Sequence, residues 1–164
     1  MEMYLKKLEL EEPIEVFNLL EETVEEGWGL MDSMTREEFP KYLEGKYNED
    51  LGVDLKNGRV PQTTYWLYVD GIPCGMILIR RRINESLLKR GGHIGYYIKK
   101  DHRRKGYGKK MLSLCLDFLR KEGLERVLIT CNVDNVGSQK IIEGNNGILE
   151  NIVDGSKRYW IDIN

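Results

Sequence analysis

Residues 92–112 restrict the possible folds of this chain more than any other segment. They read in order as a strand, a basic loop with glycines and the start of an amphipathic helix. The loop contains the pattern Arg103-x-x-Gly106-x-Gly108, and glycine lets a backbone approach a ligand without a Cβ in the way. The helix that follows offers unpaired N–H groups and the positive end of its dipole to an anion. We therefore predict a polyphosphate site at the end of this strand.

The loop also concentrates positive charge, carried by Arg103, Arg104, Lys105, Lys109 and Lys110. Two common phosphate motifs do not fit it. The Walker pattern is absent, and the dinucleotide fingerprint lacks its first glycine, whose place is taken by arginine. The simpler alternative is a tight turn before a helix with a solvated basic face.

The wider context resembles the GNAT superfamily, the GCN5-related N-acetyltransferases. Arg103, Gly106 and Gly108 match the family's cofactor motif Gln/Arg-x-x-Gly-x-Gly/Ala. A second match, Asn135-Val136-Gly137-Ser138, follows an apolar run at 127–131 and resembles the family's Asn-x-x-Ser/Ala. The close resemblance covers residues 92–149, and the N-terminal half matches only in length and order of elements.

This resemblance implies a single N-acetyltransferase domain over residues 1–164 with an α/β fold. We expect a twisted mixed sheet of six or seven strands with helices on both faces, in which the fourth and fifth strands splay apart to bind acetyl-CoA. Periodicity and turn residues predict strands at 3–10, 64–69, 72–83, 93–98, 126–131, 147–153 and 157–163. They predict helices at 13–26, 35–47, 106–122 and 136–145, with loops at 48–61 and 86–91.

The resemblance also implies which residues contact the cofactor. They lie on the fourth strand, in the loop and at the start of a later helix: Tyr97, Ile98, Arg103, Arg104, Lys105, Gly106, Tyr107, Gly108, Lys109, Asn135 and Ser138. A backbone N–H near Ile98 would stabilise the oxyanion of the reaction. Residues 27–34 would lie over the acceptor, with Trp28 and Asp32 as candidate contacts, although a tryptophan is more often packing.

The two familiar acid–base positions of the family are vacant. Ile142 stands where many members have a tyrosine, and Gly92 stands where some have a glutamate. The remaining candidates are two strand residues, His93 and Tyr97, together with Tyr96 and Tyr159. Histidine has a suitable ordinary pKa of about 6.5, but an uninvolved strand histidine is an open alternative. Adjacent tyrosines in a strand point to opposite faces, so one of Tyr96 and Tyr97 is expected in the core.

The net charge of −2 hides an asymmetry that bears on function. Residues 1–50 hold 15 acids and 5 bases, whereas residues 80–126 hold 15 bases and 5 acids. A basic half suits an anionic cofactor, and an acidic half attracts a cationic amine. An acetyl-CoA-dependent N-acetyltransferase acting on a small-molecule or peptide amine is therefore our first hypothesis, and a non-catalytic acyl-CoA-binding or sensing domain is the second. A nucleic-acid-binding module is the third, but we expect no nucleic-acid partner because aromatic interleaving is missing.

Other features of the sequence suggest a cytoplasmic protein with no membrane partner. No apolar run approaches the length of about 20 residues needed to cross a bilayer, and the N-terminus does not begin a signal peptide. The three cysteines, Cys74, Cys115 and Cys131, lie in apolar segments and read as reduced, buried residues. We expect no metal, and the sequence leaves a homodimer open.

Overall fold

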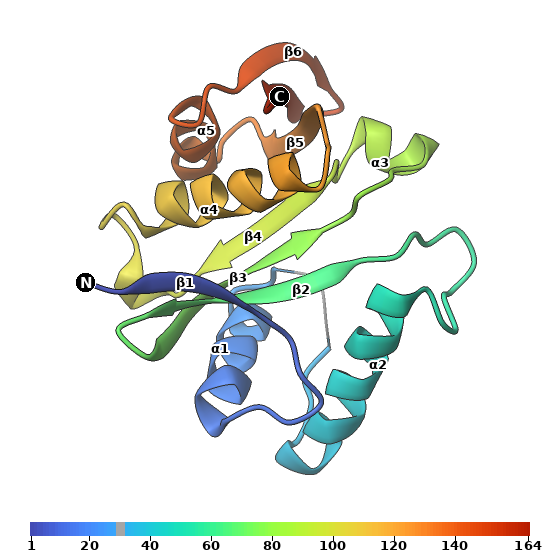
Figure 1. The fold of residues 1–164 in the computed structure, drawn as a ribbon, viewed down its shortest axis with the longest axis vertical. Helices are drawn as coiled ribbons and strands as arrows, with labels where there is room; N and C mark the ends of the chain where they lie inside the picture. Colours follow the sequence, from blue (N-terminus) through green and yellow to red (C-terminus); the bar gives the residue numbers. More distant parts are fainter. Residues whose placement is uncertain (29–31) are drawn as a thin grey trace. The chain divides into compact units, whose positions relative to one another are not determined.

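The computed structural model describes residues 1–28 and 32–164. Within them, seven strands form a four-stranded sheet of order β1-β2-β3-β4 and a three-stranded sheet of order β5-β7-β6 (Figure 1). The strands are β1 Met3–Lys7, β2 Thr63–Val69, β3 Ile72–Ile79, β4 Ile94–Ile98, β5 Arg126–Asn132, β6 Ile148–Val153 and β7 Ser156–Asp162. The helices are α1 Ile14–Glu25, α2 Phe39–Leu51, α3 Glu85–Lys89, α4 Tyr107–Lys121 and α5 Val136–Glu143, with 3-10 turns η1 Arg36–Glu38 and η2 Lys100–His102. The predicted α/β class is confirmed.

The chain forms two compact units. The first comprises Met1–Leu78 and Tyr96–Arg103, and the second comprises Ile79–Gly95 and Arg104–Asn164. The prediction of a single domain over residues 1–164 stays a prediction.

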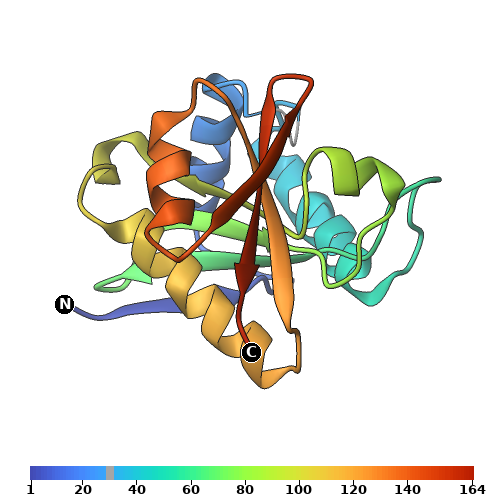
Figure 2. The ribbon, with the colours of Figure 1, turned by 90° about the horizontal axis from the view of Figure 1, so that it is seen from above.

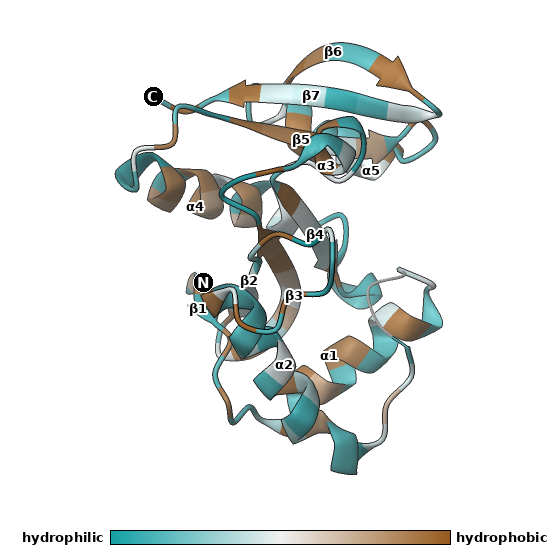
Figure 3. Cartoon of the chain, turned by 90° about the vertical axis from the view of Figure 1, so that its right-hand side faces the viewer, coloured by the Kyte–Doolittle hydropathy of each residue, from teal (hydrophilic) through white to brown (hydrophobic). Residues whose placement is uncertain are grey.

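The first unit is built on the antiparallel β1–β2 pair, in which Met3 faces Val69 and Lys7 faces Tyr65. The turn between β2 and β3 is Asp70-Gly71, with φ of 49° and 81°. Two successive positive φ values are typical of the hairpin turn that this dipeptide predicts. Apolar residues of α1, α2 and the strands form one buried core, and the apolar stretches of α1 and β3 are visible in Figure 3.

The start of the second helical segment follows the prediction, but its end does not. Thr35 and Glu38 form a reciprocal capping box at η1, as expected from the sequence. The helix was predicted to end near residue 47, and this is wrong: α2 runs to Leu51 and stops at Gly52, which has a left-handed φ of 73°. The added turn is polar and follows the helix without strengthening its apolar face, so periodicity could not detect it.

In the second unit, β7 pairs antiparallel with both β5 and β6, and α5 contacts β5 and α4 (Figure 2). The β6–β7 turn is Asp154-Gly155, with φ of 49° and 77°. Along α4, the buried side chains form one apolar stripe of Met111, Leu112, Cys115, Leu116 and Leu119, whereas Phe118 is half-buried.

Two further boundaries in the second unit correct the sequence interpretation. Residues 86–91 were expected to form a connector, but Glu85–Lys89 form the short helix α3, which Asn84 caps by accepting a hydrogen bond from Leu87 N at 2.9 Å. A helix of five residues is too short to show a periodic pattern. The third strand ends at Ile79 rather than at residue 83. After Ile79 the chain leaves the sheet and leads to Asn84, the cap of α3.

Candidate functional site

The predicted phosphate loop lies in the second unit and leads directly into α4. Arg104 has a φ of 62°, and Gly106, the N-cap of α4, has a φ of 81°. A Cβ built at Gly106 would meet no atom within 4 Å in the described chain. The N-terminal N–H groups of a helix have no carbonyl one turn earlier to bind. The unpaired N–H groups of α4 therefore follow directly after a glycine that has free space around it.

The side chains around this loop differ in exposure. Arg104, Lys105 and Lys109 are exposed, Tyr107 is half-buried and Gly108 is buried. The exposed cations can attract an anion. This distribution fits a site where backbone groups bind an anion and side chains screen its charge.

The second motif caps α5. Asn135 accepts a hydrogen bond through Oδ1 from Ser138 N at 3.1 Å, which is the geometry of an N-cap. At the other end of α5, Asn145 Nδ2 donates to the carbonyl of Lys109 at 3.2 Å. The cap and the loop therefore lie at opposite ends of this eight-residue helix, which is about 12 Å long.

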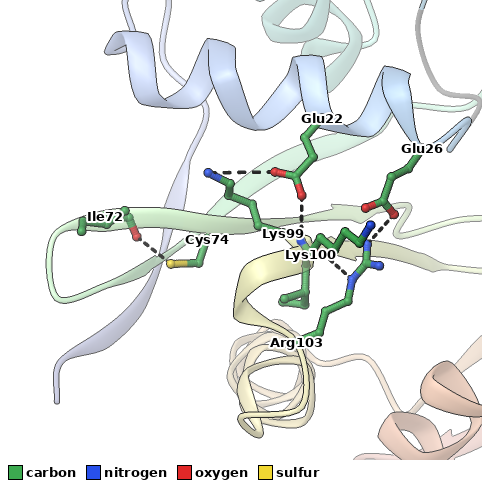
Figure 4. A network of polar contacts seen from close by, with 8 residues as sticks. Glu22, Glu26, Ile72, Cys74, Lys99, Lys100 and Arg103 are labelled. Carbon is green, nitrogen blue, oxygen red and sulfur yellow. Dashed lines mark hydrogen bonds and ion pairs between the residues drawn. The ribbon is translucent and has the colours of Figure 1, made fainter.

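In the first unit, Arg103 makes three contacts that hold its guanidinium in one place (Figure 4). Its Nε donates to the carbonyl of Ile98 at 2.9 Å, and its Nη2 donates to Glu26 Oε2 at 2.7 Å. The guanidinium also lies over the ring of Tyr97, 5.3 Å from its centroid. The side chain of the first motif residue is thus engaged by protein groups.

Tyr97 lies in the core of the first unit against Trp28, with ring centroids 5.4 Å apart. Its hydroxyl oxygen is buried and has no hydrogen-bond partner within the described residues. Burial raises the pKa of this hydroxyl, and the carboxylates of Glu22 and Glu26 raise it further. Tyr97 is therefore protonated at neutral pH and can only donate or accept a hydrogen bond as a neutral phenol.

The two predicted acceptor residues lie in different surroundings. Trp28 is half-buried on Tyr97, whereas Asp32 is exposed and has no hydrogen bond or ion pair within residues 1–28 and 32–164. Part of the predicted acceptor loop at 27–34 lies outside the described residues.

His93 is tied to β5 within the second unit. Its backbone N donates to the carbonyl of Leu128 at 2.8 Å, and its Nδ1 accepts from Leu128 N at 2.8 Å. A neutral imidazole that accepts through Nδ1 carries its proton on Nε2. Burial lowers the pKa of His93, so this neutral form is favoured. In this tautomer the ring can donate from Nε2, and it must rearrange before it can accept a proton there.

The other acid–base positions are closed or occupied. Ile142 is fully buried. The hydroxyl of Tyr159 donates to Glu143 at 3.2 Å, and burial with this carboxylate raises the pKa of Tyr159 to about 12.

Sequence reasoning missed a polar cluster on the sheet of the second unit. The buried Arg158 donates to the carbonyl of Leu88 at 2.9 Å and to Glu150 at 2.6 Å, and Trp160 Nε1 also donates to Glu150 at 2.6 Å. The hydrogen bonds from Trp160 and Arg158 lower the pKa of Glu150. Arg126 stacks 3.9 Å over the Trp160 ring. The two adjacent basic residues at the start of the otherwise largely apolar β7 were the available signal, but they do not identify the partners.

Comparison with known proteins decides the family. The profile of the acetyltransferase (GNAT) family matches residues 27–145. The chain belongs to this family. The match includes the phosphate loop, β5 and the Asn135 cap of α5, so the GNAT assignment rests on the same segments as the site geometry. N-acetyl transfer is the activity of the family, and neither a nucleic-acid-binding module nor a non-catalytic sensor is supported by the match.

One curated relative matches part of this GNAT chain. It is the "Uncharacterized N-acetyltransferase YjdG" of Bacillus subtilis (strain 168), which is 35% identical over 69 residues. That match covers 42% of this chain and 40% of the relative, so it spans about two fifths of each protein.

Solved structures share the GNAT fold over almost the whole chain. A Salmonella typhimurium acetyltransferase that modifies the N-terminal serine of ribosomal protein L7/L12 has a TM-score of 0.70 at 17% identity, covering 99% of this chain and 95% of its own. RimL in complex with coenzyme A has a TM-score of 0.73 at 17% identity, with 98% and 94% covered. The microcin C7 self-immunity acetyltransferase MccE, in complex with acetyl-CoA and AMP, has a TM-score of 0.72 at 16% identity, with 99% and 93% covered. No helix in the described part of the chain is long and apolar enough to cross a membrane.

Proposed function

We propose that this GNAT protein transfers the acetyl group of acetyl-CoA to a primary amine by direct attack in a ternary complex. The observation that carries the proposal is the open, left-handed Gly106 at the N-terminus of α4. It leaves room for a phosphate beside helix N–H groups, which is the arrangement that binds anions. The exposed side chains of Arg104, Lys105 and Lys109 add the positive charge that a pyrophosphate requires.

The other predicted cofactor residues are proposed to contact different parts of acetyl-CoA. Backbone groups of residues 106–109 would hold the pyrophosphate, with Tyr107 and Gly108 in the first helical turn. Asn135 and Ser138, one helix length away, would lie toward the pantetheine arm. Tyr97 and Ile98 on β4 would follow the same arm, as the resemblance implies.

In this scheme the main task of the protein is to position the two reactants. Acetyl-CoA would supply an acyl group already activated as a thioester. The backbone N–H of Ile98 would donate to the carbonyl oxygen as negative charge develops on it. The amine loses a proton to water when it forms the new amide bond, and the leaving sulfur gains a proton or a hydrogen bond. Holding both reactants in one geometry can supply much of the acceleration.

Proton transfer would use water rather than a strong side-chain base. His93 is held with Nε2 protonated, so it would orient water or acceptor as a donor, and its role as a base would need the other tautomer. Tyr97 is proposed as a neutral hydrogen-bond donor near the reacting groups. No metal is required by this scheme.

The acceptor is proposed to be a small-molecule or peptide amine in the cytoplasm. RimL modifies the α-amino group of a ribosomal protein and MccE confers self-immunity to microcin C7, so acceptors of different kinds occur on this fold. Trp28 and Asp32 are the proposed acceptor contacts, and a homodimer remains compatible with the proposal.

A pair of glycines at the two ends of α4 tests the cofactor site. Gly106 and Gly123 both have left-handed φ values, 81° and 92°, and a Cβ at either one meets no atom within 4 Å in the described chain. Gly106→Val and Gly123→Val should therefore cost similar backbone strain. Only Gly106→Val should abolish acetyl-CoA binding in calorimetry.

Activity is tested by thiol release from acetyl-CoA with a panel of amines and peptides. The proposal expects release with at least one amine and formation of its acetylated product. Absence of both turnover and CoA binding in the parent protein, or equal binding by Gly106→Val and the parent, would overturn it.

A further inference from the structure

The C-terminal end of α1 carries charges that its own helix disfavours. Glu22, Glu25 and Glu26 occupy the last turn and the cap, and this turn has no basic residue. Carboxylates are unfavourable at the negative end of a helix dipole. Where a sequence breaks a local rule in this way, the compensating contacts point to a role elsewhere in the molecule.

The compensating contacts all come from the segment that follows β4 (Figure 4). Glu22 Oε1 accepts from the backbone N of Lys100 at 2.7 Å, and its Oε2 lies 4.0 Å from Lys99 Nζ. Glu26 Oε2 accepts from Arg103 Nη2 at 2.7 Å. We call Glu22 and Glu26 the acidic pair. It binds residues 99–103, which lead into the phosphate loop.

These contacts fix one peptide bond. The carbonyl of Ile98 accepts from Arg103 Nε at 2.9 Å, and the N–H of the next residue, Lys99, donates to the carbonyl of Cys74 at 2.8 Å. Both polar groups of the Ile98–Lys99 peptide are therefore held. Its orientation sets ψ of Ile98 and so restricts the direction of the Ile98 N–H.

We propose that Arg103 is a positioning residue rather than a phosphate ligand, and that with the acidic pair it fixes the end of β4 for catalysis. The proposal rests on the proposed function, in which the Ile98 N–H faces the developing oxyanion. The side chain of Arg103 is 40% exposed, but the charge-assisted bond to Glu26 and the ring of Tyr97 already engage its guanidinium. Arg103 thus acts on the reaction through Ile98 and not through the pyrophosphate.

The direction in which Glu26→Ala changes the affinity for CoA distinguishes the two roles. If Arg103 bound phosphate, Glu26 would compete for its guanidinium, and Glu26→Ala would tighten CoA binding. If Arg103 is a positioning residue, Glu26→Ala and Arg103→Ala should each lower kcat by about 10-fold, because misplaced groups lose rate rather than affinity. The dissociation constant for CoA should then change by less than about threefold, and the double variant should be no worse than either single one.

Matched variants control for charge. Glu25 lies in the same turn, is exposed and has no hydrogen bond or ion pair in the described part of the chain, so Glu25→Ala removes an equal charge and should leave kcat unchanged. Arg103→Lys keeps the positive charge but cannot bond Ile98 and Glu26 together. It should therefore fail to restore kcat, whereas a phosphate ligand would be largely replaced by lysine.

A measurement without ligand keeps this test separate from that of the proposed function. Amide hydrogen exchange at residues 99 and 100 should become faster in Arg103→Ala and Glu26→Ala than in the parent and in Glu25→Ala. Unchanged exchange, tighter CoA binding by Glu26→Ala, or rescue by Arg103→Lys would overturn the proposal. If the parent itself neither binds CoA nor turns over, the proposed function fails, and the exchange result alone decides whether the acidic pair fixes this segment.

Discussion

Gly92→Ala is expected to destabilise the second unit strongly, although it adds a single carbon. Gly92 has a φ of 61°, and a Cβ built there would lie 2.4 Å from the carbonyl oxygen and 2.9 Å from the carbonyl carbon of Leu128. These are backbone atoms of β5 and cannot rotate away as a side chain can. The same carbonyl accepts the hydrogen bond from His93 N, so moving it breaks a contact between the segments.

Three contributions set the expected loss. A left-handed conformation costs a residue with a side chain about 1–2 kcal/mol. Forcing an added carbon against packed atoms typically costs about 1–3 kcal/mol. Loss of the hydrogen bond adds about 0.5–1.5 kcal/mol. Since relaxation that relieves the clash gives up the hydrogen bond, the contributions overlap, and we expect a total of about 2–5 kcal/mol.

The assay is urea denaturation of the parent, Gly92→Ala and Gly95→Ala. Gly95 is a close control because it also lies in the second unit, has no left-handed φ, and a Cβ there meets no atom within 4 Å among the described residues. Its replacement should change the free energy of unfolding by less than about 1 kcal/mol. Equal denaturation midpoints for the two variants would refute the packing argument. Gly92→Glu, which restores the carboxylate used by some family members, should be at least as unstable as Gly92→Ala and should not gain activity.

Three further predictions concern single side chains. Asn135→Ala should lower the free energy of unfolding by about 1 kcal/mol because it removes the α5 cap, while Asn135→Asp should keep the cap and the stability. An unchanged melting temperature of Asn135→Ala with a raised KM for acetyl-CoA would instead indicate a cofactor contact. Burial lowers the pKa of His93 below 6.5, so its contribution to stability is present above that pH and is lost as pH falls through the folded-state value. Denaturation midpoints measured across that range should fall less in His93→Gln than in the parent. A pH titration followed by one-dimensional proton NMR should give the folded-state pKa of His93. Hydrogen bonds from Trp160 and Arg158 lower the pKa of Glu150 below 4.5, so its contribution is present above 4.5 and is lost as pH falls through the lower value; Glu150→Gln should flatten this part of the acid denaturation curve, and an unchanged curve would contradict the assignment.

The parts of the fold that were predicted correctly are those specified by adjacent residues. Asp70-Gly71 and Asp154-Gly155 each require two positive φ values, and the sequence supplies the residues that tolerate them. The helix α4 repeats its apolar residues over 15 positions, long enough for the period to be unambiguous. The short helix α3 and the last turn of α2 lack such repetition, and only Asn84 and Gly52 mark them.

For the candidate site, the sequence predicted local backbone structure but not the partners of the side chains. The motif placed Gly106 and Asn135 correctly at two helix N-termini, because local turn and cap chemistry determines both. It could not show that Arg103 turns to Glu26, which is 77 positions away, since that contact depends on how α1 packs beside β4. Nor could it show that Leu128 occupies Nδ1 of His93 and so selects the ring's tautomer.

The packing around positions 92 and 142 leaves no room for the acid and base that the family usually has there. Gly92 lies so close to the Leu128 backbone that no side chain fits, and Ile142 is fully buried, with its Cγ2 2.4 Å from where a Cβ of Gly147 would lie. A tyrosine at 142 would have to displace these neighbours, so neither position can regain its function by a single substitution. On the proposed function, catalysis would then depend on the geometry in which amine and thioester are held, with the amine losing its proton to water. The pH dependence of turnover should therefore follow the pKa of the amine used, and it should shift when amines of different basicity are compared, whereas a profile that stays fixed across amines would identify a titrating group of the protein.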